Sequence, residues 1–385
     1  MATYNVTHLH TAESFDRPYI FPNPHTKASP SDHTTNSQVE TFHRNLPNYA
    51  ETKLHNLPSV AKALGFSHVL LKDESTRFGL PSFKIAGASW AIHNALCKHC
   101  SYPPTTSLAD LRAELRKRGD VSLVTCTEGN WGRAVARMSN YLGIKAKIYV
   151  PGFMSKATQD LIRGEGADVI VLYGKSYDDA VAAAIYESKT TSALLVMDTS
   201  FDSYTEIPAW VTEGYQTILQ ETERQVAAIT GGKVADIATC SVGVGSWAHA
   251  VVSHYRATSS STKLISVEPD TAASFKESLH QSTITPVQTA HTIMDGMNCG
   301  TTSQIAWPVL REGVDFAIAV SDWEAHECVL ELRELGVEAG PCGAANLAAL
   351  KRAVGEGVFG AEEERKGSAV VLFSTEGRRG YVVPE

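Results

Sequence analysis

The sequence predicts an α/β fold with largely parallel sheets, and three observations support this prediction. Short apolar runs rich in β-branched residues alternate with helix-length segments from residue 68 to residue 374. The runs are apolar throughout instead of alternating with polar residues, which is typical of strands buried on both faces of a parallel sheet. The length of 385 residues is enough for two or three domains.

The expected strands and helices follow one another along most of the chain. Strands are expected at 68–72, 121–126, 146–150, 168–172, 193–198, 236–240, 263–268, 316–320 and 369–374. Helices are expected at 84–96, 131–142, 156–165, 177–189, 208–228, 246–257 and 321–335. Asp178 and Asp179 are expected to stabilise the first turn of helix 177–189 as acids near its positive end.

Composition indicates a globular protein whose partner is a small molecule. Lys+Arg 34 against Asp+Glu 42 gives a net charge of −8 with no basic stripe, so neither a nucleic-acid nor a membrane partner is expected. No apolar run reaches the ~18–20 residues of a membrane-spanning helix. The seven cysteines are scattered and the N-terminus lacks an apolar leader, which favours reduced thiols and a cytoplasmic location. The Cys97–Cys100 pair lacks a second pair, so no metal site is expected.

Three expected strands end in clusters of small and polar residues, at 127–130, 241–246 and 374–377. Ligands of parallel sheets bind at the carboxyl ends of the strands. In the second cluster, Gly243 and Gly245 precede a helix, so their backbone N–H groups could cradle a phosphate. The same loop also fits a dinucleotide fingerprint with Glu268 as the ribose-binding acid, or a tight turn without a ligand.

Lys84 follows a polar turn and opens the expected helix 84–96. The positive end of the helix dipole disfavours the ammonium form there and so favours a neutral, nucleophilic amine. A single lysine is usually a solvated surface residue, so the surrounding sequence has to decide its role.

The surrounding segment KDESTRFGLPSFK, at 72–84, resembles the lysine segment of the diaminopropionate ammonia-lyases. These are fold-type II pyridoxal-phosphate (PLP) enzymes related to threonine dehydratase and the tryptophan synthase β subunit. The resemblance covers residues 45–380, with further motifs in the same order: TEGNWGRAVA at 127–136, YDDAV at 177–181, MDTSFDSYTEIPAW at 197–210, VGVGSWAHAV at 242–251, VEPDTA at 267–272, IMDGMNCG at 293–300, IAWP at 305–308 and FSTEG at 373–377.

The resemblance implies two doubly wound, largely parallel-sheet lobes with pyridoxal 5'-phosphate in the cleft between them, and a homodimer. The implied parts are an N-terminal arm at 1–45, a larger cofactor-binding domain at 46–85 and 190–385, and a smaller α/β domain at 86–189.

The resemblance also implies roles for individual residues. Lys84 would form the Schiff base with the cofactor and move the Cα proton. Asp198 would lie near the substrate amino group, with a strand-end cap as its alternative role. The remaining cofactor contacts would be Asn130 at the 3-oxygen, Gly243, Val244, Gly245 and Ser246 at the phosphate, and Ser374 or Thr375 at the pyridine nitrogen.

The chain departs from the family pattern in two places. Glu128 and Trp131 stand in a loop where the family has aspartate and histidine. Glu128 is a candidate second base for the opposite enantiomer, or an acid at the helix start, and Trp131 is expected to narrow the pocket. Pro341 and Cys342 take the places of a family glutamate and serine, so polar contacts near the cofactor ring are expected to differ.

The expected activity is therefore α,β-elimination on a small amino acid, either 2,3-diaminopropionate-like or β-hydroxy. It would give a 2-oxo acid and ammonia through an aminoacrylate. The alternatives are β-replacement, racemisation with Lys84 and Glu128 on opposite faces, and a degenerate homologue that binds PLP without turnover. A nicotinamide-dependent oxidoreductase is a further alternative, based on the glycine loop and Glu268.

Overall fold

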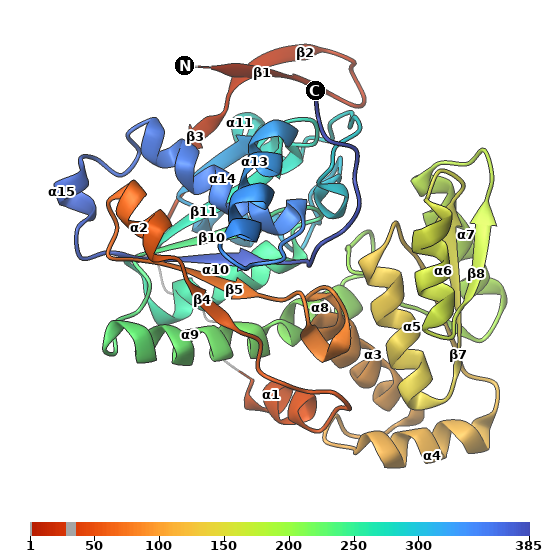
Figure 1. Ribbon diagram of the computed structural model, residues 1–385. Coiled ribbons are helices and arrows are strands. Elements are labelled where there is room, and N and C mark those ends of the chain that lie inside the picture. Colours follow the sequence, from red (N-terminus) through yellow and green to blue (C-terminus); the bar gives the residue numbers. More distant parts are fainter. Residues whose placement is uncertain (1, 28–35) are drawn as a thin grey trace. The chain divides into compact units, whose positions relative to one another are not determined.

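The computed structural model describes residues 2–27 and 36–385, which group into two compact units (Figure 1). The first unit contains Glu51–Thr76, Ile218–Glu385 and the described residues before Asn36. The second unit contains Asn36–Ala50 and Arg77–Thr217, and so takes in all of 86–189. Both units are built on parallel sheets, as predicted. No helix in the described residues is long and apolar enough to cross a membrane.

The first unit has a seven-stranded sheet whose five inner strands are parallel. A short antiparallel strand pairs with each side of this parallel core. In sheet order the strands are β3 (Ile20–Pro22), β12 (Phe316–Val320), β11 (Lys263–Pro269), β10 (Ile237–Ser241), β13 (Ala369–Ser374), β5 (His68–Asp73) and β4 (Leu54–Asn56).

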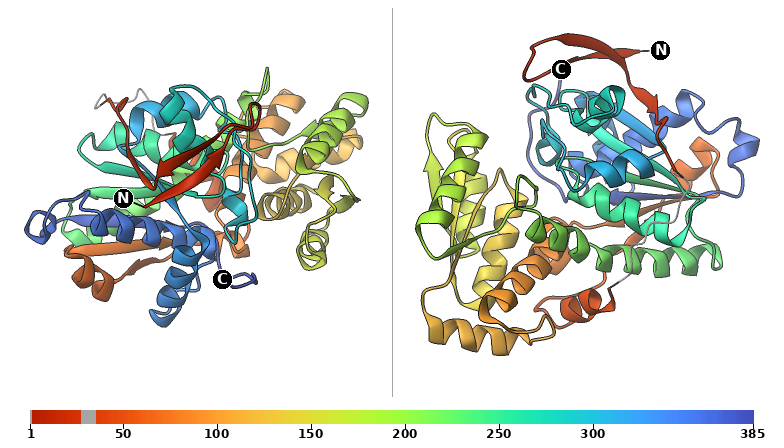
Figure 2. Two further views of the ribbon diagram at one scale, coloured as in Figure 1. Left: turned by 90° about the horizontal axis from the view of Figure 1, so that it is seen from above. Right: turned by 180° about the vertical axis from the view of Figure 1, so that it is seen from behind.

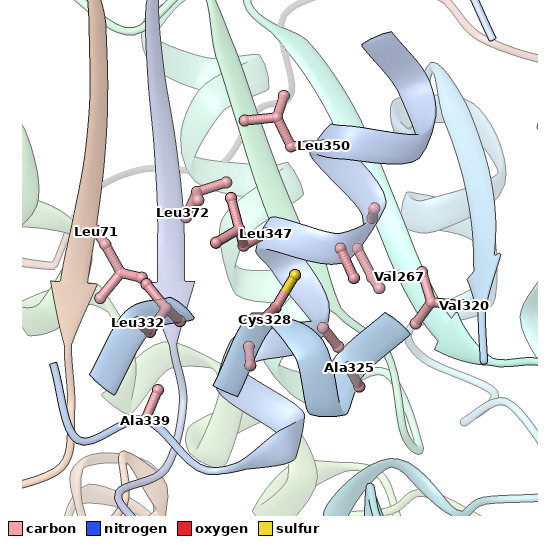
Figure 3. Close-up of a cluster of buried hydrophobic side chains, with 14 of the residues drawn as sticks. Leu71, Val267, Val320, Ala325, Cys328, Leu332, Ala339, Leu347, Leu350 and Leu372 are labelled. Atoms are coloured by element: carbon pink, nitrogen blue, oxygen red, sulfur yellow. The ribbon is translucent and has the colours of Figure 1, made fainter. Parts of the chain in front are cut away.

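The central strands of the first unit, β10 and β13, are buried at every position, because helices cover the sheet. Leu71, Val267, Val320 and Leu372 pack against α13 and α14 in one apolar cluster (Figure 3). The helices of this unit are α2 (Pro58–Leu64), α9 (Gln216–Thr230), α10 (Ser246–Thr258), α11 (Ser274–Gln281), α12 (Trp307–Gly313), α13 (Asp322–Glu334), α14 (Pro341–Gly355) and α15 (Glu362–Arg365), with a 3₁₀ turn η2 (Asp295–Met297).

The predicted N-terminal arm begins with an antiparallel hairpin of β1 (Thr3–Thr7) and β2 (Ser14–Pro18), drawn in dark red in Figures 1 and 2. Its continuation is β3, the antiparallel strand beside β12. The part of the arm at residues 28–35 lies outside the described residues.

The second unit has a four-stranded parallel sheet. Its strands, in sheet order, are β8 (Asp168–Leu172), β7 (Lys145–Pro151), β6 (Ser122–Cys126) and β9 (Ala193–Leu195). Its helices are α1 (Ser37–Arg44), α3 (Lys84–Cys100), α4 (Leu108–Arg118), α5 (Asn130–Leu142), α6 (Lys156–Gly164), α7 (Tyr177–Thr190) and α8 (Glu206–Gly214), with a 3₁₀ turn η1 (Arg77–Gly79).

Local sequence signals place most helix ends. Ser176 and Asp179 form a reciprocal capping box at the start of α7, which confirms the predicted role of Asp179. The prediction of one helix over 208–228 is wrong, because α8 ends at Gly214 and α9 begins at Gln216. Gly214 lets α8 touch α3, since a Cβ there would lie 2.6 Å from the Ala86 carbonyl oxygen.

Candidate active site

Lys84 and Asp198 meet in the second unit. Lys84 is the first residue of α3, as predicted, and its Nζ lies 2.6 Å from Asp198 Oδ2. The two side chains are largely buried, at 17% and 11% exposed. The lysine amine is thus held at a fixed point by a short contact with a carboxylate.

The segment that carries Asp198 is fixed by Tyr204. The Tyr204 hydroxyl donates to the Leu195 carbonyl at 2.9 Å and accepts from the Met197 N–H at 3.0 Å. Burial raises the pKa of Tyr204, so its hydroxyl stays protonated and keeps this donor role at neutral pH. Asp198 therefore follows β9 in a backbone that leaves little freedom to move.

A tight turn after β6 carries Glu128 and Asn130. Thr127 Oγ1 accepts from the Gly129 and Gly132 N–H groups, both at 3.0 Å, and α5 begins at Asn130. Because β6 and β9 are neighbouring parallel strands, this turn leaves the same sheet edge as the segment that carries Asp198. The unit thus collects Lys84, Asp198 and the turn at the carboxyl ends of its strands.

Trp131 points into the interior of the second unit. It is 5% exposed, and its Nε1 donates to Thr125 Oγ1 at 3.0 Å and to the Val196 carbonyl at 3.4 Å. The expectation that Trp131 narrows a pocket is therefore wrong. Its indole instead ties β6 to the segment that follows β9, where an N–H donor is satisfied inside an apolar core.

The first unit has its own candidate binding element, the glycine loop between β10 and α10. Gly245 has φ +102°, which favours glycine, and a Cβ there would lie 3.0 Å from the Ala306 Cβ. A Cβ on Gly243 would lie 2.9 Å from the Gly296 carbonyl oxygen. A side chain at either position would therefore collide with a neighbouring segment of the first unit, so the loop needs glycine at both positions to pack.

The donors around this loop fit a phosphate group. The 13-residue helix α10 begins at Ser246, so its positive end and free N–H groups face the loop. Ser303 N–H donates to the Val244 carbonyl at 2.8 Å and so fastens the 302–303 segment to the loop. Beside it, the buried Thr302 hydroxyl has no hydrogen-bond partner among the described residues, and an anion would give it one.

The end of β13 lies next to the glycine loop, because β10 and β13 are neighbours in the sheet. Ser374 is fully buried and its Oγ donates to the Glu376 carbonyl at 3.3 Å. Asn346 joins the two strand ends, since its Nδ2 donates to Ser241 Oγ and to the Phe373 carbonyl, each at 2.8 Å. Thr375 follows and is 4% exposed.

Three further residues shape this part of the first unit, and the sequence gives no role for them in advance. Asn346 joins the strand ends, and Gly343 leaves room for Ser374, whose Oγ would lie 2.4 Å from a Cβ at position 343. Glu376 is buried, and its Oε1 accepts from the Cys342 N–H at 3.4 Å, which caps α14. The only signal for Glu376 in the sequence is its place in the FSTEG motif.

Glu268 is already engaged. Its two carboxylate oxygens accept from the Phe275 and Lys276 N–H groups at 2.8 Å each, so it holds the start of α11. Burial raises its pKa to about 7, against the backbone hydrogen bonds that lower it. The interpretation of Glu268 as a ribose-binding acid is therefore wrong, and the nicotinamide alternative loses its second feature.

Comparison with known proteins gives a family and close relatives. A family model described as "Pyridoxal-phosphate dependent enzyme" matches residues 46–375. The diaminopropionate ammonia-lyase of Salmonella typhimurium strain LT2 is 34% identical over 297 residues, which cover 74% of this chain and 72% of the relative.

Solved structures agree with this result. The structure of Escherichia coli diaminopropionate ammonia lyase in complex with D-serine matches with a TM-score of 0.84 at 28% identity, over 98% of this chain and 95% of that one. The same enzyme with an aminoacrylate-PLP azomethine reaction intermediate matches with a TM-score of 0.81 at 27% identity and the same coverage.

Proposed function

The chain belongs to the family of pyridoxal-phosphate dependent enzymes and is an ammonia-lyase, and we propose that its substrate is a small amino acid with an amino or hydroxyl group on the β-carbon. Loss of the Cα proton and the β group leaves an unsaturated amino acid, which water converts to a 2-oxo acid and ammonia. The contact between Lys84 and Asp198 is the observation that supports this proposal most directly.

The proposed cofactor contacts come from named groups of the chain. The N–H groups of Gly243, Val244, Gly245 and Ser246 are proposed to bind the phosphate, as the start of α10 and the buried Thr302 hydroxyl at this loop favour. Pyridoxal phosphate supplies an aldehyde that bonds to amines and a ring that withdraws electrons from Cα.

Two further contacts to the cofactor ring are proposed. Asn130 is proposed to donate to the 3-oxygen, and the hydroxyl of Ser374 or Thr375 to face the pyridine nitrogen. A neutral hydroxyl does not enforce a protonated ring, so electron withdrawal is moderate and favours prompt loss of a β leaving group.

The proposed proton transfers run through Lys84 and Glu128. Asp198, at 2.6 Å from Nζ, is proposed to hold the Lys84 amine in position, and Lys84 is proposed to act as nucleophile and base. Glu128, at the start of α5, is proposed as the base for the enantiomer whose Cα proton points away from Lys84.

Product analysis tests the proposed reaction. Cofactor-loaded protein is incubated with each enantiomer of 2,3-diaminopropionate and of serine, and ammonia, 2-oxo acid and enantiomeric composition are measured. Elimination yields two ammonia per oxo acid from diaminopropionate and one from serine. Interconversion of enantiomers without ammonia would identify a racemase instead, and amino acid recovered unchanged until a second nucleophile is added would identify β-replacement.

We also propose that the protein is a cytoplasmic homodimer. All seven cysteines are free thiols, which suits a reducing compartment. Analytical ultracentrifugation of the loaded protein is expected to give twice the chain mass of 41.6 kDa. A monomer at working concentration would reject the dimer, and fractionation of cells tests the location.

A further inference from the structure

The second unit contains a cavity that the proposed chemistry does not use. Its volume is about 1140 Å³, and α1, the segment 104–107, α4 and the end of α5 line it. This is large enough for a drug-sized ligand. None of its lining residues is among the residues proposed to bind cofactor or substrate.

The charge of the cavity has one sign. Among the lining residues only Arg112 and Arg116 carry a charge, and neither has a hydrogen-bond or ion-pair partner among the described residues. They lie four residues apart on α4 and so share one face of the helix. The acids of α4 lie outside the lining: Asp110 accepts from the Ser107 hydroxyl, at the edge of the cavity, at 2.7 Å, and Glu114 pairs with Arg118 at 3.0 Å.

Much of the rest of the lining is apolar or hydrogen-bonded within the protein. Phe42, Leu46 and Leu108 supply apolar surface. The hydroxyls of Thr41 and Thr106 donate to backbone carbonyls at 3.1 Å and 2.7 Å, so they are not free donors. The arginines are therefore the groups that set which ligand charge the cavity favours.

We propose that this cavity binds an organic anion. Arg112 and Arg116 hold a phosphate or carboxylate head, and an apolar body packs against Phe42, Leu46 and Leu108. The cavity supplies no carboxylate to repel such a head, and planar guanidinium groups match both head groups in geometry.

Calorimetric titration of the cofactor-loaded protein tests the proposal with four probes. Phenyl phosphate and benzoate carry both an anion and a ring, inorganic phosphate carries only the anion, and benzyl alcohol carries only the ring. One of the two organic anions is expected to bind, and the tighter one identifies the head group. Inorganic phosphate and benzyl alcohol, which each carry only one of the two features, are expected to bind at least about tenfold more weakly.

Matched variants locate the binding. The double variant Arg112→Gln, Arg116→Gln is expected to bind the organic anion about tenfold more weakly than the wild type. Lys117→Gln, on the same helix but outside the lining, is expected to leave it unchanged. All three side chains are exposed, so the variants are expected to fold, and thermal unfolding checks this.

Three results would overturn the proposal. The first is that neither organic anion binds the wild-type protein. The second is that the double variant binds them as tightly as the wild type does. The third is that inorganic phosphate binds as tightly as phenyl phosphate. If the double variant changes the oligomeric state but not the titrations, the face is an interface between copies of the chain and not an anion site.

Discussion

Lys84 and Asp198 are 114 residues apart in the sequence and 2.6 Å apart in the structure. The position of Lys84 at a helix start was predictable, because a polar turn precedes an apolar period there. The contact with Asp198 was not, since it depends on where the backbone goes after β9, and Tyr204 fixes that path. The alternative role of Asp198 as a strand-end cap is disfavoured by this contact.

Replacing Lys84 tests its proposed role. Lys84→Ala is expected to remove the visible band of bound cofactor and to lower the rate of ammonia release about a thousandfold or more, because both the nucleophile and the base are lost. Absorbance and product assays measure the two effects, and thermal unfolding reports on the fold. Activity within tenfold of the wild type would take Lys84 out of the mechanism.

Glu128 has two possible roles that one variant separates. Glu128→Gln keeps the size and the hydrogen bonding but removes the base, so it is expected to slow the reaction with one enantiomer about a hundredfold and spare the other. Rates on D- and L-2,3-diaminopropionate, with cofactor content held equal, measure this. Equal rates on both would leave Glu128 as an acid that stabilises the start of α5.

At the scale of elements, buried parallel strands were predictable and their surroundings were not. The apolar runs placed β5, β6, β10, β11, β12 and β13 within one or two residues, because both faces of these strands are covered. The glycine loop was recognised from Gly243 and Gly245. The residues that back it, Thr302 and Ser303, come from a distant segment with no local signal, and the direction of Trp131 depends on packing.

The glycine loop can be tested by adding a single methyl group. Gly245→Ala is expected to weaken the binding of pyridoxal phosphate about tenfold to a hundredfold. The reason is that φ +102° is strained for alanine and that its Cβ would lie 3.0 Å from the Cβ of Ala306. Equilibrium titration of the apoprotein measures this. Gly357→Ala, with φ +76° and open space around it, is the control for backbone strain alone. Equal cofactor affinity in the two variants would mean that the loop does not bind the phosphate.

At the scale of the molecule, the fold class followed from the sequence, but the N-terminal arm had more structure than its composition indicated. Its hairpin is held on α11 by a buried carboxylate. Glu277 is fully buried and accepts two hydrogen bonds from Arg17, at 2.7 Å and 2.8 Å. His8 Nε2 lies 2.7 Å from the same carboxylate. Charged side chains spaced along a polar segment do not reveal such pairing.

This carboxylate should make the stability of the first unit depend on pH. Burial raises the pKa of Glu277, but hydrogen bonds from Arg17, Gln281 and His8 outweigh it and lower the pKa to about 2, from 4.5. The ionised group therefore stabilises the fold above pH 4.5, and this contribution of about 3 kcal/mol is lost as pH falls from 4.5 to about 2.

Acid titration of the unfolding free energy measures the effect. Glu277→Gln is expected to flatten the pH dependence between pH 4.5 and 2, while Glu312→Gln, from the exposed pair with Lys27, should keep it. An unchanged slope in the Glu277 variant would mean that other carboxylates govern acid unfolding.

The most direct test of the central claim combines the spectrum with the products. Pyridoxal-phosphate-loaded protein is titrated with each enantiomer of 2,3-diaminopropionate while absorbance, ammonia and 2-oxo acid are followed in one cuvette. The cofactor band is expected to change on mixing, and two molecules of ammonia are expected for each molecule of oxo acid. A band that shifts without any ammonia, or a protein that takes up no cofactor, would contradict it.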